Sequence, residues 1–318
     1  MRKTTTEVLP ADAGGIARAA QLLRKGRLVA FPTETVYGLG ADARHGEAVA
    51  RIFEAKGRPR FNPLIVHLAD PAQTRRIAVF NDTAKRLAEA FWPGPLTLVL
   101  PLRPDAGLSA LVSAGLETVA LRVPEHPLAR ALLKEFAGPV AAPSANVSGR
   151  ISPTRAEHVL EGLGGRLEAV LDGGPCAVGL ESTIIGLAPG PVLLRPGGLP
   201  VEVIEDCLDM PLGRGEEGAR PSAPGQLESH YAPQAAMRLN AEAAAPGELL
   251  LGFGNVACDL NLSPSGDLVE AAANLFHHLR QLDALGAGKI AVTPIPERGL
   301  GRAINDRLRR AAAPRPAS

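Results

Sequence analysis

The sequence predicts an α/β fold in which helices cover a large, mostly buried sheet. From residue 12 to about residue 207, stretches with helical periodicity alternate with short apolar runs, a pattern typical of layered α/β architecture. Several of these runs are apolar at consecutive positions, as expected for strands that are covered on both faces. After Cys207 the composition shifts to Pro, Gly and charge before a second, smaller alternating unit begins.

Local signals predict the elements of the first unit. Asp12 is placed to cap a helix that Gly26 ends, and Val49, Ile52 and Phe53 repeat at helical spacing in the next helix. The expected strands, in chain order, are Leu28 to Phe31, Leu64 to Leu68, Leu96 to Leu100, Thr118 to Val123, Pro139 to Ala142, Thr183 to Leu187 and Val192 to Leu194.

The composition also predicts where the domains divide. Residues 208–235 show no sustained period and are expected to link a domain of residues 1–207 to a small α/β domain of residues 236–318. In the small domain, "ELLLGFG", a helix around residues 268–285, "KIAVTPI" and a last helix from about Arg298 predict the order strand, helix, strand, helix. The tail "AAAPRPAS" is expected to be disordered.

Charge, cysteine content and hydropathy argue against several classes of protein. The 34 basic and 33 acidic side chains nearly cancel, so a site for a polyanion must be local. The three cysteines form no CxxC pair, which argues against a zinc knuckle and a disulfide framework. No apolar run approaches the length of a membrane span, and the N-terminus lacks the apolar core of a signal peptide. We therefore expect a cytoplasmic protein.

Several common site motifs do not fit the chain. Gly38, Gly40 and Ala43 match the dinucleotide pattern GxGxxG/A, but a stretch that includes Thr33 to Tyr37 separates the glycines from the preceding strand, and "KGRPR" stands where an acidic ribose ligand is expected. The chain contains no GxxxxGK[ST], GxSxG or HExxH, and its seven histidines are scattered, so we predict no metal site. Bound phosphates would have to be held by side chains and loop amides without a Walker lysine.

The stretch "KGRPR" places Lys56, Arg58 and Arg60 just before an apolar run. A solvated loop is the simpler interpretation of such a charge run. However, Arg122 lies inside an expected strand and Arg195 ends another, and a charge in a strand needs a partner or a ligand. A satisfied structural role stays open for each of them. Together the cations suit an anionic ligand with several phosphates and a carboxylate.

Polar side chains lie next to three of the expected strands. "FPTETVYGLG" places Glu34 and Thr35 after one strand, "AAPSANVSG" places Ser144 and Asn146 after another, and "GLESTII" places Ser182 before a third. An ordinary turn would also explain "PSANVSG". Because ligand crevices form at the ends of strands in open α/β sheets, the three stretches together favour one binding site.

Taken in order, these stretches resemble the YrdC-like family, and in particular its long-form L-threonylcarbamoyladenylate synthases, which carry an additional C-terminal domain. The resemblance rests on "PTETVYGLG", the K-x-R of Lys56 and Arg58, "NPL", "WPGPLTLVL", "ALRVP", the S-x-N of Ser144 and Asn146, "STI", "RPG" and "HYAP", which span residues 32–233. The C-terminal domain matches only by position and coarse pattern. The implied fold is a large twisted mixed sheet covered by helices, followed by a small Rossmann-like α/β domain.

The resemblance implies that ATP, L-threonine and bicarbonate are converted to threonylcarbamoyl-AMP and pyrophosphate, with Mg²⁺ accompanying ATP. The product would supply the threonylcarbamoyladenosine modification of tRNA through a downstream tRNA threonylcarbamoyl-transferase machinery, and weak direct binding of RNA or tRNA stays open. Positioning and charge stabilisation carry such a transfer, so no nucleophilic side chain is required.

Family roles carry over onto matching positions of this chain. The implied catalytic residues are Lys56, Arg58, Ser144 and Asn146. The implied ATP-binding residues are Arg58, Asn62, Thr118, Ser144, Ser152, Arg195 and Tyr231. The implied threonine-binding residues are Thr35, His67, Arg122, the backbone of Ala142, and Ser182. The linker, with His230 and Tyr231, is expected to act as a lid over the site.

Two alternatives compete with this interpretation. A double-stranded RNA-binding protein without adenylating activity would use the cationic cluster to follow phosphates, although 3% aromatic residues argue against base stacking. Arg309 and Arg310 could then touch RNA, but a solvated helix face is the simpler interpretation. The related domain of hydrogenase-maturation carbamoyltransferases would bring zinc-finger cysteine pairs and an acylphosphatase-like segment, and this chain has neither.

Overall fold

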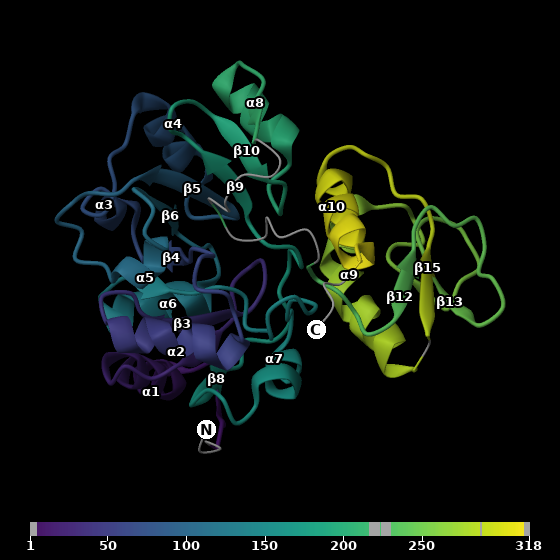
Figure 1. The fold of residues 1–318 in the computed structure, drawn as a ribbon, viewed down its shortest axis with the longest axis horizontal. Helices are drawn as coiled ribbons and strands as arrows, with labels where there is room; N and C mark the ends of the chain where they lie inside the picture. Colours follow the sequence, from purple (N-terminus) through teal and green to yellow (C-terminus); the bar gives the residue numbers. More distant parts are fainter. Residues whose placement is uncertain (1–4, 216–222, 224–229, 287, 315–318) are drawn as a thin grey trace.

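The computed structural model describes residues 5–215, 223, 230–286 and 288–314. Within these residues the chain forms one sheet of 11 strands and one sheet of four strands. Figure 1 shows the two sheets in separate lobes. The predicted large α/β sheet followed by a smaller one is thereby confirmed.

The large sheet is mixed. Its strand order is β1-β8-β2-β3-β7-β4-β6-β5-β9-β10-β11, and parallel and antiparallel neighbours both occur. In chain order the strands are β1 (Glu7–Leu9), β2 (Val29–Phe31), β3 (Gly38–Asp42), β4 (Ile65–His67), β5 (Leu96–Pro101), β6 (Thr118–Arg122), β7 (Val140–Ala141), β8 (Ala169–Leu171), β9 (Thr183–Gly186), β10 (Val192–Arg195) and β11 (Gly213–Arg214).

Helices cover both faces of this sheet. Successive residues of a strand point to opposite faces, so one strand contributes side chains to two separate cores. Val29 and Phe31 pack in one core with α1 and α6, whereas Leu28 and Ala30 pack in another with α2, α4, α7 and α8. The helices of the first domain are α1 (Ala13–Arg24), α2 (Gly46–Lys56), α3 (Pro71–Thr74), α4 (Asp82–Phe91), α5 (Ala110–Ser113), α6 (Pro127–Phe136), α7 (Ala156–Leu163) and α8 (Val201–Leu208). The expected cap of α1 is present, since the Asp12 carboxylate accepts a hydrogen bond from Gly15 N at 2.8 Å.

The two glycines of the candidate dinucleotide motif lie inside β3. This strand runs antiparallel to β2 and no helix begins at the glycines, which agrees with the expectation that a dinucleotide motif does not fit here. A Cβ at Gly40 would lie 2.8 Å from Phe31 Cε1 and 3.0 Å from Val140 Cγ1. Close packing within the sheet therefore explains this glycine.

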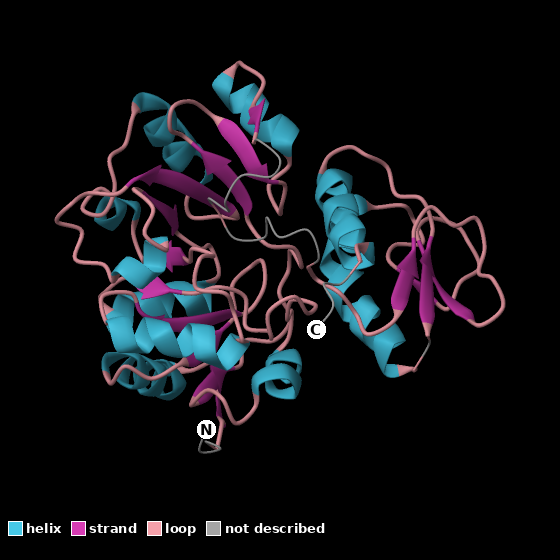
Figure 2. Cartoon of the chain, in the orientation of Figure 1, coloured by secondary structure: helices cyan, strands magenta, loops and turns pink. Residues whose placement is uncertain are grey.

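The C-terminal domain is a small parallel sheet with two long helices. Its strand order is β12-β15-β13-β14, and every pair is parallel. Figure 2 shows the helices α9 and α10 (cyan) between this sheet and the first domain. Strands β12 and β14 were not predicted, and α10 includes the first residues of the tail that was expected to be disordered, whereas residues 315–318 lie outside the described residues. The elements are β12 (Ala236–Arg238), β13 (Glu248–Gly252), β14 (Leu260–Asn261), α9 (Leu268–Ala284), β15 (Lys289–Val292) and α10 (Leu300–Ala312).

The two domains share an apolar core. Val36, Ile151 and Leu180 of the first domain belong to the same buried cluster as Tyr231 and Phe276, the latter on α9. The C-terminal domain is therefore packed onto the first domain and is not merely tethered to it. In the described part of the chain, no helix combines the length and the hydropathy that a bilayer span requires.

Candidate functional site

Two parallel strands bring a histidine and an arginine to one end of the large sheet. In the register of β4 and β6, His67 pairs with Arg122, and each is the last residue of its strand. The ring of His67 lies edge-on to Phe31, with ring centroids 6.2 Å apart, on the face of the sheet that α1 and α6 cover. Ala142 follows the neighbouring antiparallel strand β7 and faces the same side. Strand register and side-chain alternation thus bring Ala142, beside Ile65, to the same face of the sheet as His67 and Arg122, close to one spot.

A pocket lies at this spot. Nine of the residues predicted from the sequence line it: Thr35, Arg58, His67, Arg122, Ala142, Ser144, Ser182, Arg195 and Tyr231. The pocket wall also includes His230, which was expected only as part of the lid, and residues that were not assigned a role: Thr33, Val36, Gly38, Ile65, Pro143 and Glu181.

Five predicted residues do not line this pocket. Asn62 and Ser152 are fully buried, and Ser152 donates a hydrogen bond to the Glu181 carboxylate on the wall. Thr118 begins β6, four residues before Arg122, which corresponds to about 13 Å along a strand. The structure therefore does not bring Thr118 to the pocket. The other two predicted residues that do not line this pocket are Lys56 and Asn146.

The three cations of "KGRPR" differ in burial because the chain reverses direction within this stretch. Lys56 ends α2, and Gly57 adopts the left-handed conformation with φ +60°, which favours glycine and reverses the chain. Lys56 and Arg58 are consequently buried, with 1% and 8% of their surface exposed, whereas Arg60 is exposed. The interpretation as a solvated loop therefore holds for Arg60 and is wrong for the other two.

Lys56 holds the loop that carries the S-x-N motif. Its ammonium donates hydrogen bonds to the backbone carbonyls of Ser144 and Asn146. Burial, and then the charge of Arg58, keep the pKa of Lys56 well below its ordinary value. Arg58 Nη2 donates to the Pro63 carbonyl at 2.9 Å, and burial lowers the pKa of Arg58 to about 10, so its guanidinium is charged at neutral pH.

Arg122 has a partner inside the protein. Its Nη2 donates to Glu34 Oε1, its Nη1 donates to Thr35 Oγ1 at 2.8 Å, and its Nε donates to the Gly94 carbonyl at 3.3 Å. Burial by itself would raise the pKa of Glu34, but the charge and hydrogen bond of Arg122 outweigh burial, so the pKa lies below the ordinary value. A guanidinium has five N–H groups, so two on the terminal nitrogens remain for a ligand carboxylate.

The imidazole ring of His67, beside Arg122, is neutral and can accept or donate a hydrogen bond. Burial, more than the nearby charge of Arg122, lowers the pKa of His67 to about 3. Its Nδ1 is buried and has no hydrogen-bond partner among the described residues. A buried polar atom without a partner is costly, which indicates that a ligand completes the site.

Arg195 and Ser182 form another part of the pocket wall. Arg195 donates from Nη2 to the Ser182 carbonyl at 2.9 Å, and the Ser182 hydroxyl lies 2.7 Å from Thr97 Oγ1. Next to them, Glu181 lies between Ser152 and Arg307 of α10. Burial would raise the pKa of Glu181, but the charges of Arg307 and Arg195 hold it below the ordinary value.

Tyr231 closes the pocket from the linker side. It is 1% exposed, its backbone has φ +63°, and its hydroxyl has no partner in the described chain. Its ring stacks on Phe276 with centroids 5.7 Å apart. The expected lid falls largely on residues 216–222 and 224–229, which lie outside the described residues.

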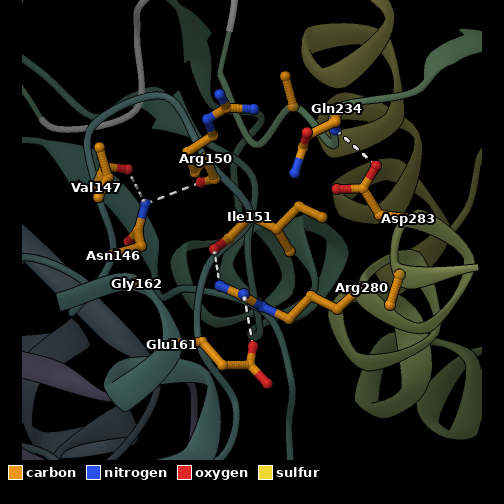
Figure 3. Close-up of a pocket in the computed structure, with 11 residues that line it drawn as sticks. Asn146, Val147, Arg150, Ile151, Glu161, Gly162, Gln234, Arg280 and Asp283 are labelled. Carbon is orange, nitrogen blue, oxygen red and sulfur yellow. Dashed lines mark hydrogen bonds and ion pairs between the residues drawn. The ribbon is translucent and has the colours of Figure 1, made fainter. Parts of the chain in front are cut away.

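A second hollow of about 490 Å³ lies at the domain seam, behind the S-x-N loop (Figure 3). Asn146 is on its wall, and its Nδ2 donates to the carbonyls of Val147 and Arg150. From α9, Arg280 donates to the Ile151 carbonyl at 2.6 Å. Asn146 therefore shapes the loop through these hydrogen bonds and does not line the first pocket, while Arg280 of the C-terminal domain supports the chain at Ile151.

One group of side chains has the spacing of metal ligands, namely Glu157, His158 and His277. His158 Nδ1 accepts a hydrogen bond from the backbone N–H of Thr154, and burial lowers the pKa of His158 to about 3. The single proton of the neutral ring is therefore on Nε2, which lies 3.2 Å from His277 Nδ1. A protonated nitrogen cannot bind a metal, so this group fits an interdomain hydrogen bond.

Known proteins resemble the chain over both domains. The Sua5/YciO/YrdC family model, described as "Telomere recombination", matches residues 21–197, and a model described as "Threonylcarbamoyl-AMP synthase, C-terminal domain" matches residues 199–313. The chain belongs to the Sua5/YciO/YrdC family. The resemblance to the YrdC-like family and its long-form synthases is confirmed.

Members of the Sua5/YciO/YrdC family match the chain over nearly its full length. The threonylcarbamoyl-AMP synthase of Bacillus subtilis is 43% identical over 98% of this chain and 96% of its own length, and that of Pyrococcus abyssi is 43% identical over 92% and 93%. The crystal structure of P. abyssi Sua5 complexed with L-threonine has a TM-score of 0.89 and 41% identity, covering 97% of this chain and 98% of that one. The chain is therefore an enzyme of the threonylcarbamoyl-AMP synthase type.

Proposed function

We propose that the chain catalyses the formation of threonylcarbamoyl-AMP and pyrophosphate from ATP, L-threonine and bicarbonate. The observation that carries this proposal is the pocket itself, where buried arginines, hydroxyls and unpaired polar atoms meet at the end of the sheet. The similarity to P. abyssi Sua5, which was crystallised with L-threonine, supports the choice of amino acid.

Threonine is assigned to the end of the pocket formed by the strand ends. Arg122, oriented by Glu34, would hold the substrate carboxylate through its two remaining N–H groups. Thr35, the backbone of Ala142, and Ser182 complete this end. The unpaired Nδ1 of neutral His67 suits the threonine hydroxyl, and a substrate without this hydroxyl would leave the nitrogen unpaired, which discriminates strongly against valine.

ATP is assigned to the opposite end of the pocket. Arg58 and Arg195 would hold the triphosphate, with Ser144 and Tyr231 beside it. Asn62 and Ser152 do not line the pocket, so the proposed roles require them to act through the residues that do. Lys56 and Asn146 would act through the loop that they shape rather than through contact with phosphate. We do not extend the proposal to Thr118, which lies at the far end of β6.

The reaction needs few covalent contributions from the protein. Bicarbonate and the threonine amine condense to a carbamate with loss of water. A carbamate oxygen then bonds to the α-phosphorus of ATP, the bond from that phosphorus to the bridging oxygen breaks, and pyrophosphate leaves with the electron pair. The buried arginines stabilise the charge that develops on the phosphates, and the closed pocket limits hydrolysis of the labile carbamate.

Mg²⁺ would enter as part of the ATP substrate. Mg²⁺ sites use one or two carboxylates together with substrate phosphates. Glu34 and Glu181, the carboxylates nearest to the substrates, are occupied by arginines and hydrogen-bond donors. These residues therefore do not fit a protein-held ion, and we derive no step through the metal.

The wider assignments belong to the same proposal. Residues 1–207 would form the catalytic domain, residues 236–318 a supporting domain, and residues 208–235 a linker whose described part contributes His230 and Tyr231 to the pocket. The product would pass to a tRNA threonylcarbamoyl-transferase machinery. The free thiols of all three cysteines agree with a reducing compartment such as the cytoplasm.

Pyrophosphate release tests the proposal. The purified protein is incubated with ATP, Mg²⁺ and bicarbonate, with and without L-threonine, and the adenylate product is identified by mass. Release that requires both threonine and bicarbonate supports the proposed reaction. Folded protein that releases no pyrophosphate with threonine but binds double-stranded RNA, with an affinity that falls steeply with salt, would favour the RNA-binding alternative.

A further inference from the structure

The largest fully buried side chain of the described residues comes from the C-terminal domain. Arg307, on α10, is 0% exposed, yet its Nε donates at 2.8 Å to Glu181 Oε2 of the first domain. Glu181 lines the pocket that we assign to the substrates. The C-terminal domain thereby contacts, through Arg307, a side chain that lines the site.

Arg307 also contacts the linker residue that closes the pocket. Its guanidinium carbon lies 4.9 Å from the centroid of the Tyr231 ring, on the face of that ring. Asp306 accepts from Arg307 Nη1 and from Arg310 Nε, and the Arg310 carbonyl accepts from the backbone N–H of His230 at 3.1 Å. One helix thus holds both Glu181 and the His230–Tyr231 segment.

The charge of Glu181 is unfavourable where a triphosphate binds. The groups that face it are Arg195, Arg307, Lys56 and the Ser152 hydroxyl, with Tyr231 and His230 alongside. Lys56 is already bonded to two carbonyls, and Arg195 to Ser182. Arg307 is therefore the close ion-pair partner of this carboxylate.

We propose that Arg307 is a positioning residue of the ATP end of the site, contributed by the C-terminal domain, which neutralises Glu181 and holds the Tyr231 ring against the pocket. This inference rests on the proposed function. It gives the C-terminal domain a defined part in ATP binding, carried by one side chain that contacts neither substrate.

A purely structural ion pair would show a different pattern of kinetics. If Arg307 only joined the domains, its loss would lower stability and reduce the amount of active enzyme, with both KM values unchanged. If it neutralises Glu181, its loss leaves a negative charge beside the triphosphate, so KM for ATP rises while KM for threonine, which binds at the Arg122 end, stays nearly constant.

The chain offers a matched control on the same helix. Arg302 also forms an interdomain ion pair, with Glu202 at 3.4 Å, but its side chain is 44% exposed and lies outside the pocket wall. We would measure pyrophosphate release at varied ATP and varied threonine for wild type, Arg307→Gln, Arg307→Lys and Arg302→Gln, together with the melting temperature of each.

Arg307→Gln is expected to raise KM for ATP about 30-fold, the lower end of the range for leaving a buried charge unpaired, with KM for threonine changed by less than about twofold. Arg307→Lys, which keeps the charge but not the planar fork, should be intermediate. Arg302→Gln should match wild type. Adding Glu181→Gln to Arg307→Gln should return KM for ATP to within about threefold of wild type, because a neutral amide needs no counter-charge.

Three results would overturn the inference: unchanged KM for ATP in Arg307→Gln, an equal rise in both KM values, or no recovery in the double variant. If Arg307→Gln fails to fold, KM for ATP and KM for threonine of Arg307→Lys and of the double variant test the inference instead. An inactive but folded wild type would defeat the proposed function instead, whereas an active wild type with unchanged KM for ATP in Arg307→Gln would defeat only this inference.

Discussion

The ion pair between Glu34 and Arg122 gives the sharpest prediction for stability. The Glu34 side chain is 8% exposed and that of Arg122 is 4% exposed, so both charges are removed from water. Glu34 Oε1 accepts from Arg122, and Oε2 accepts from the backbone N–H groups of Glu125 and His126. In Glu34→Gln one of the two acceptors becomes a donor, and the buried guanidinium loses its counter-charge.

Leaving one charge of a buried pair uncompensated costs about 3–5 kcal/mol. We therefore expect Glu34→Gln to lower the free energy of unfolding at pH 7 by about 3 kcal/mol, the low end of that range, because Thr35 and Gly94 still accept from Arg122. The matched control is Glu7→Gln. Glu7 pairs with Arg18 at 2.6 Å, but the two side chains are 43% and 39% exposed, so water screens the pair and the control should match wild type.

Urea denaturation with linear extrapolation measures both variants. The pKa of Glu34 is lowered by folding, so its stabilising contribution is complete above the ordinary value of 4.5 and is lost as the pH falls through the lower folded value. The difference between wild type and Glu34→Gln should accordingly shrink below about pH 4.5. A loss below about 1 kcal/mol at pH 7, or a difference that grows in acid, would refute the reasoning.

Three further predictions concern the pocket and the sheet. Arg58→Ala should reduce threonine-dependent pyrophosphate release at least about 100-fold, because a buried charged contact is lost, while exposed Arg60→Ala should retain wild-type release. Tyr231→Phe should leave the melting temperature unchanged or raised, since the hydroxyl has no partner in the described chain, but should raise KM for ATP, and a marked loss of stability would contradict this. Gly40→Ala should lower the free energy of unfolding by about 1–3 kcal/mol in the same urea assay, because the added Cβ would lie 2.8 Å from Phe31 Cε1. An unchanged urea midpoint would contradict this prediction.

The sequence predicted the buried strands better than the short ones. Runs such as Leu96–Pro101, which is apolar except at Thr97, are recognisable as strands covered on both faces. Gly38–Asp42 contains two glycines and has little intrinsic strand preference, and its neighbours in the sheet decide its conformation. Glu7–Leu9 and Ala169–Leu171 are only three residues long and pair with each other across the chain, which no local pattern reveals.

The same contrast holds for the site. Motifs at strand ends located most of the pocket wall, because polar residues next to apolar runs are a local signal. Glu181 and Arg307 are 126 residues apart, and in "INDRLRR" Arg307 resembles the neighbouring arginines of an exposed helix face. The solvated interpretation does hold for Arg309, which is 58% exposed and paired with Glu297, whereas the Arg310 side chain is 24% exposed. Only the assembled domains distinguish these three arginines.

The shared apolar cluster has a consequence for the evolution and dissection of the chain. Val36, Ile151 and Leu180 bury their side chains together with those of α9, so a protein cut after residue 207 would present them to water. The truncated form would lose solubility as well as Arg307, and its weak activity would misrepresent the catalytic domain. We expect the two lobes to melt in one cooperative transition, so that selection on either lobe acts on the stability of the whole enzyme.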